Sequence, residues 1–160
     1  MAVISASELK WYGSGADNLG GAISVSEVAP STLFDAVSGD ESAAGDDEYR
    51  CVYFKNTSAN SGGYQNAVVW IETQTPGDDD ISIALAGEGK NGTAETVVDE
   101  GTAPSGEVFT APTNKAGGLS LGTLAQNDYY PIWIKRHVPV GTTAYSGNSF
   151  VLTVEGDSTA

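Results

Sequence analysis

The chain contains a single cysteine, Cys51, so no disulfide can form within it. Because Cys51 lies in the middle of an alternating segment, we expect a small buried hydrophobic group, the commonest role of a free thiol. The first ten residues lack the basic and apolar regions of a secretory signal, and no apolar run approaches the roughly 18 residues of a membrane span. We therefore expect a protein that is assembled in the cytoplasm and has no membrane partner.

Basic residues are also scarce. Seven lysines and arginines stand against 21 aspartates and glutamates, which gives a net charge of −14. A field of this sign repels phosphate backbones and anionic lipid headgroups, so nucleic acid is not an expected partner. The charge favours a locally basic partner surface or an assembly in which apolar contacts overcome repulsion, and simple solubility explains it equally well.

Groups that carry catalysis or bind metals are few. His137 is the only histidine, and in a predicted strand it is expected to be structural. Residues 118–122 match the Gly-x-Ser-x-Gly elbow of serine hydrolases but lack the flanking strand and helix, so a glycine-rich loop is predicted. The acidic runs 46–48 and 78–80 lack the spacing of a calcium loop and are predicted to be solvated turns. We therefore expect no catalytic residue, no metal site and no cofactor.

Short segments in which apolar and polar residues alternate are abundant. There are five of them: Tyr49 to Thr57, Gln65 to Thr75, Asp80 to Ala86, Tyr129 to Val138 and Ser149 to Glu155. Alternation with a period of two predicts β-strands, and 20 glycines with many Thr, Ser, Asn and Asp residues supply the turns between them. The sequence predicts an all-β fold, an antiparallel β-sandwich of the immunoglobulin-like or jelly-roll type.

Two of these segments carry more detailed expectations. Apolar residues on both faces of the segment 67–73 predict a central strand, and the turn-rich connection 75–80 predicts a hairpin with the strand that follows. Both faces of the segment 49–57 are mixed, so either of them could face the core.

Weaker signals predict minor elements. Ser31 to Phe34 is expected to open a short helix, and Ser38 to Asp40 is expected to break it. The Asn91-Gly92 pair predicts a tight turn that leads into a short strand over 94–98.

Residues 1–30 are predicted to form an extended N-terminal arm, and residues 31–160 a single sandwich domain. In the arm, Leu9, Trp11 and Tyr12 lie in a context rich in glycine and serine. Because large aromatic side chains are favoured anchors of interfaces, we expect the arm either to dock on its own sandwich or to contact a neighbouring subunit. Leu9, Trp11 and Tyr12 are the candidate inter-subunit contacts.

Seven segments of the chain resemble virion structural proteins of tailed bacteriophages. They are spread over most of the length of the chain: Ile4 to Tyr12, Leu19 to Ser24, Leu33 to Glu41, Glu48 to Tyr53, Ala103 to Gly106, Ile132 to Arg136 and Asn148 to Phe150. The resemblance implies a non-enzymatic, β-rich accessory protein that binds the outside of the capsid as a decoration or cement protein and stabilises the shell. The implied location is the capsid surface of the virion.

The expected partners are the major capsid protein and further copies of the chain, as a homo-oligomeric dimer or trimer. We expect deletion of residues 2–24 to abolish capsid binding and to leave the sandwich folded. One alternative function is a tail or baseplate component whose edge strands pair in a ring. Another is a carbohydrate-binding or adhesin module that stacks sugars on Trp11, Trp70 and Trp133.

Overall fold

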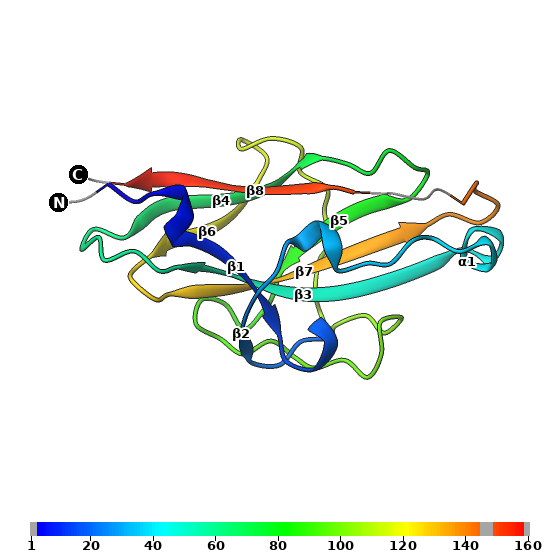
Figure 1. Ribbon diagram of the computed structural model, residues 1–160, viewed down its shortest axis with the longest axis horizontal. Coiled ribbons are helices and arrows are strands. Elements are labelled where there is room, and N and C mark those ends of the chain that lie inside the picture. Colours follow the sequence, from blue (N-terminus) through cyan, green and yellow to red (C-terminus); the bar gives the residue numbers. More distant parts are fainter. Residues whose placement is uncertain (1–2, 145–148, 159–160) are drawn as a thin grey trace.

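The computed structural model describes residues 3–144 and 149–158, and these residues form two antiparallel sheets packed as a sandwich (Figure 1). One sheet has the strand order β2-β1-β3-β7-β5 and the other β6-β4-β8. The strands are β1 Leu9–Ser14, β2 Ile23–Glu27, β3 Asp46–Asn56, β4 Tyr64–Thr73, β5 Asp80–Leu85, β6 Leu119–Leu124, β7 Tyr129–Val138 and β8 Val151–Ser158. The predicted all-β antiparallel sandwich is confirmed.

The main core lies between the two sheets. Val69 and Ile71 point inward from β4, which is the central strand of its sheet as predicted. The other buried members come from both sheets and from the start of β8: Val52, Phe54, Tyr64, Ala67, Ile81, Ile83, Leu121, Leu124, Ile132, Ile134, Phe150 and Leu152. Burial of this much aliphatic and aromatic surface is the dominant stabilising contribution to such a fold.

A second hydrophobic cluster covers the opposite face of the five-stranded sheet. Cys51, Tyr53 and Trp133 are fully buried there, beneath Ala94 and Val97 of the connection 86–118. Figure 1 shows the green first part of this connection running along the outer side of the sheet, and its yellow end reaching the other sheet, where the Pro112 carbonyl accepts from the Ile71 N–H. This second cluster explains why the segment 49–57 has apolar residues on both faces, because β3 buries side chains on both sides of the sheet.

The predicted hairpin between the second and third segments is wrong. β4 pairs with β6 and β8, whereas β5 pairs with β7 in the other sheet. The connection 74–79 therefore passes from one sheet to the other. The Gln74 side chain bonds both backbone groups of Ile81, accepting from its N–H at 2.9 Å and donating to its carbonyl at 2.7 Å. A side-chain amide thus occupies the place of a neighbouring strand.

The short helical elements differ from the expected ones. They are η1 Ala6–Glu8, η2 Ala16–Asn18, η3 Pro30–Thr32 and α1 Gly39–Ala44. The helix expected near Ser31 is the single turn η3, and α1 begins where the pattern was expected to break. Ser38 caps α1, because its hydroxyl accepts from the Glu41 N–H and the Glu41 carboxylate accepts from the Ser38 N–H. This reciprocal capping box is the reason that the acidic segment is helical.

The predicted strand over 94–98 is limited to one isolated bridge between Gly21 and Ala94. The Asn91 backbone has a φ of 61°, as a tight turn requires, but the chain after the turn packs on the outer cluster instead of joining a ladder.

The segment predicted as an arm contributes two strands to the five-stranded sheet. β1 lies between β2 and β3, with Leu9 opposite Asn56 and Trp11 opposite Phe54. The Trp11 and Phe54 rings meet edge to face, 5.1 Å apart. The described part of residues 1–30 therefore docks on its own sandwich, and the sheet extends across the predicted boundary at residue 30.

Candidate interaction surfaces

The three candidate contact residues lie on β1 but do not share one face. Leu9 and Trp11 are partly buried against the main core, whereas Tyr12 packs against the outer cluster on the opposite side of the sheet. Successive side chains of a strand point to opposite faces, which explains the separation. Contacts of these residues with another subunit stay a prediction, and Tyr12 is the one that also lines a surface depression.

This depression lies beside β2, the outermost strand of the five-stranded sheet. It has a volume of about 270 Å³ and is lined by Tyr12, Ile23, Ser24, Val25 and Lys55. Among the described strands β2 pairs only with β1, and the side chain of Val25 is 97% exposed. An open edge with an exposed aliphatic side chain is a surface that other chains can pair with or pack against.

Lys55 is electrostatically unlike the other basic residues. Within the described residues, six of the seven lysines and arginines form ion pairs: Lys10, Arg50, Lys90, Lys115, Lys135 and Arg136. Lys55 forms none there, and its ammonium group lies 5.8 Å from the centre of the Tyr12 ring. Lys10, which lies directly opposite Lys55 in the register of β1 and β3, is already paired with Glu27 at 2.9 Å.

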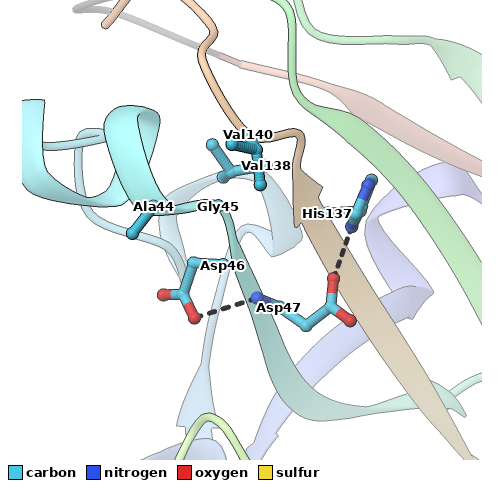
Figure 2. A pocket seen from close by; sticks show the side chains of 7 residues that line it. All are labelled: Ala44, Gly45, Asp46, Asp47, His137, Val138 and Val140. Atoms are coloured by element: carbon cyan, nitrogen blue, oxygen red, sulfur yellow. Dashed lines mark hydrogen bonds and ion pairs between the residues drawn. The ribbon is translucent and has the colours of Figure 1, made fainter.

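A second hollow lies at the other end of the sandwich, next to α1. It has a volume of about 350 Å³ and is lined by Ala44, Gly45, Asp46, Asp47, His137, Val138 and Val140. Figure 2 shows the His137 imidazole turned toward the Asp47 carboxylate, with 2.6 Å between Nδ1 and Oδ1. Lys135 lies 3.1 Å from the other oxygen of Asp47. Partial burial alone would raise the pKa of Asp47, but hydrogen bonds from His137 and Lys135 outweigh burial and lower it.

Three carboxylates gather around a buried arginine near this end. Acceptor oxygens of Asp35, Glu41 and Glu48 lie within 4.8 Å of one another. The side chain of Arg136 is 2% exposed; it forms an ion pair with Glu48 and bonds both the carbonyl and the carboxylate of Asp35. Its guanidinium also stacks over the Phe34 ring at 5.2 Å. The positive charge at this cluster is therefore supplied by the chain itself.

Glu48→Gln is expected to reduce the dependence of stability on pH. Burial raises the pKa of Glu48 from 4.5 to about 7, although Arg136 lowers it. Because the folded-state pKa is above the unfolded value, stability from this group is complete below about pH 4.5 and is lost as the pH rises through 7. Urea unfolding of the parent should lose on the order of 1–3 kcal/mol between pH 5 and 8 from this source. The same pH dependence in the Gln variant would contradict this assignment.

The residues that sequence patterns associate with catalysis lie apart. Ser120 of the elbow motif is exposed on β6, whereas His137 lies on β7 of the other sheet. Cys51 is fully buried, and burial raises the pKa of its thiol to about 12, which disfavours the reactive thiolate.

The tryptophans offer little surface for stacking a sugar. Trp133 is fully buried, Trp70 is 9% exposed, and Trp11 packs on Phe54. These three tryptophans, on which the carbohydrate-binding alternative depends, thus mostly pack within the chain and are not open for stacking. In the part of the chain that the structure describes, the helices are too short and too polar to cross a lipid bilayer.

The chain matches no protein-family model, and a search of curated proteins and of solved structures finds no significant match.

The predicted solvated turn at residues 46–48 is wrong, because these residues begin β3 and Glu48 is buried. Sequence reasoning also missed two features of these surfaces. The sequence did contain a signal for the buried Arg136 ion pair. Ile132, Ile134 and Arg136 alternate along one strand and so share one face, which places the arginine on the inward side of the sheet. No signal in the sequence indicated that Lys55 would lack an ion pair, because this depends on where the carboxylates lie in space.

Proposed function

We propose that the chain is a non-enzymatic virion structural protein that binds the outside of a tailed-phage capsid as a decoration or cement protein. The observation that carries the proposal is the open edge of β2. There the exposed Val25 lies beside the predicted contact residue Tyr12 and Lys55, which forms no ion pair within the described residues. This edge is a feature for binding another chain and not for transforming a small substrate.

The distribution of the other side chains supports a binding role. Ser120, His137 and Cys51 lie on three different strands, and the thiol is buried. The resemblance to phage virion proteins supplies the location, and a net charge of −14 suits the outside of a capsid better than a surface facing packaged DNA. A cement protein acts through many copies, so modest contacts at each site add up to a stable coat.

Co-sedimentation with three targets tests this proposal. The tagged protein is mixed with undecorated expanded phage heads, with purified tails, and with glycan-bearing cells. We expect saturable recovery with heads at a fixed number of copies per capsid protein. Recovery with tails alone would favour the tail component, and recovery with cells alone would favour the adhesin. Either result would overturn the capsid proposal.

A further inference from the structure

The β2 edge differs from the far edge of the same sheet. On β5, Ile83 exchanges two backbone hydrogen bonds with Thr110, at 2.8 and 2.9 Å, and Gln74 occupies both backbone groups of Ile81. β5 is therefore covered by the chain itself. β2 has only local protection, since the Ser24 hydroxyl accepts from the Ser26 N–H at 3.1 Å. Native proteins usually cover or shield an edge of this kind, so β2 is a candidate site for a partner from outside the chain.

The depression beside β2 has a defined chemistry. Ile23 and Val25 supply aliphatic surface, while the Lys55 ammonium and the Tyr12 hydroxyl form no hydrogen bond within the described residues. An ammonium group and a phenol beside aliphatic carbon are complementary to a carboxylate that follows an aliphatic side chain.

One exposed segment of this chain has that composition. Val98 is 85% exposed, and Asp99 follows it directly and is exposed. The Asp99 carboxylate has one hydrogen bond, which its Oδ1 accepts from Thr102. The other exposed valine with an acidic neighbour is Val108, but there the acidic residue, Glu107, precedes the valine and does not follow it.

The two surfaces lie on the same side of the five-stranded sheet, because Tyr12 and Val97 both pack in the outer cluster. Along β3 they are toward opposite ends, since the Glu100 carbonyl accepts from the Tyr49 N–H. The Val97 N–H donates to the Leu19 carbonyl at 2.9 Å, and Gly21 forms a bridge with Ala94. These contacts tie the segment before Val98 to the connection between β1 and β2. When a site and its complement lie on the same side of one subunit, a two-fold axis can satisfy both at once.

We propose that a second copy of this chain occupies the β2 depression, with its Val98 against Val25 and its Asp99 carboxylate on Lys55. The contact is made twice in a two-fold dimer. The occupant is a second copy because its acidic segment complements Lys55, the one lysine or arginine that forms no ion pair within the described residues. The proposal deepens the proposed function, on which it rests for its biological setting.

Sedimentation equilibrium of the free protein at 50 mM salt tests the dimer. We expect Lys55→Glu and Asp99→Lys each to raise the dimer dissociation constant at least tenfold. The double variant Lys55→Glu with Asp99→Lys should restore the parent value within about threefold, because the charges are exchanged and not removed. Lys90→Glu is the matched control, since Lys90 is paired with Asp128 away from β2, and it should leave the dimer unchanged. Circular dichroism establishes that each variant is folded.

The possible outcomes separate this proposal from capsid binding. A parent chain that is monomeric at 1 mM, or a dimer that is insensitive to both single variants, would overturn the dimer. So would a failure of the charge exchange to restore association. If Lys55→Glu abolishes head binding by a monomeric parent, the depression binds the shell and the second-copy proposal is wrong. A dimer that follows the charge exchange but does not bind heads would support this contact and overturn only the proposed function.

Discussion

Arg136→Met should lower the free energy of unfolding by about 3–5 kcal/mol near pH 7.5, because it leaves a buried carboxylate without its counter-ion. The side chains of Arg136 and Glu48 are 2% and 1% exposed, so solvent cannot replace the lost partner. Methionine preserves much of the aliphatic stem, which limits any cavity. The measurement is equilibrium urea unfolding followed by circular dichroism.

Two controls separate the buried charge from simple loss of packing. The double variant Arg136→Met with Glu48→Gln removes both charges and should recover most of the loss. Arg50→Met removes the only other arginine, but its partner Glu100 is 49% exposed and can be solvated, so about 1 kcal/mol is expected. Without Arg136 the pKa of Glu48 rises further, so the deficit should shrink as the pH falls toward 5. An equal loss in the single and double variants would show that packing, and not charge, dominates.

Deletion of residues 2–24 should abolish cooperative folding, contrary to the expectation from sequence that the sandwich folds without an arm. The deletion removes β1, which lies inside the five-stranded sheet, and with it the Trp11 ring that packs on Phe54. It also removes Leu19 and Gly21, which hold the connection over the outer cluster. The near-ultraviolet circular dichroism signal and a cooperative thermal transition should both be lost.

A point variant tests the same claim in a milder form. Trp11→Ala should cost roughly 3–5 kcal/mol, as large-to-small changes at well-packed aromatic sites do. Val3→Ala is the control, because Val3 is 63% exposed and should contribute almost nothing. A truncated chain that melts at the parent temperature would mean that β1 is dispensable to the fold.

Five of the eight strands that the structure describes were predictable because alternation in their own residues encodes them, whereas β6 lies where a glycine-rich loop was predicted. The segment Tyr129 to Val138 was predicted with the same bounds that β7 has, since Ile132 and Ile134 alternate regularly. Pairing was harder to predict, because it depends on residues far apart in sequence. β4 and β5 follow each other with a turn-rich connection, yet each finds its partners elsewhere. A turn signal alone does not distinguish a hairpin from a passage between sheets.

The prediction of an extended arm for the N-terminal segment relied on its composition. Its glycines and serines are typical of a flexible arm, but several shape turns next to short strands. Gly20 and Gly21 have φ values of 92° and 82°, and at Gly20 an added Cβ would lie 1.7 Å from the carbonyl oxygen of Glu95. These glycines let the β1–β2 connection approach the outer cluster closely, a role that composition does not reveal.

The candidate surfaces were only partly predictable. Tyr12 was identified because aromatic side chains are common at interfaces, and it lines the β2 depression. The exposure of Val25 could not be predicted from the sequence, since an isolated valine in a short strand is equally compatible with a buried position. Its exposure follows from the position of β2 at the edge of the sheet.

The most direct test of the central claim is a heat challenge of undecorated phage heads, with and without a saturating amount of the protein. If the chain is a cement protein, bound copies hold shell subunits together, and the temperature at which the heads release their DNA should rise by several degrees. Heads that bind the protein but release DNA at an unchanged temperature would contradict a role in stabilising the shell.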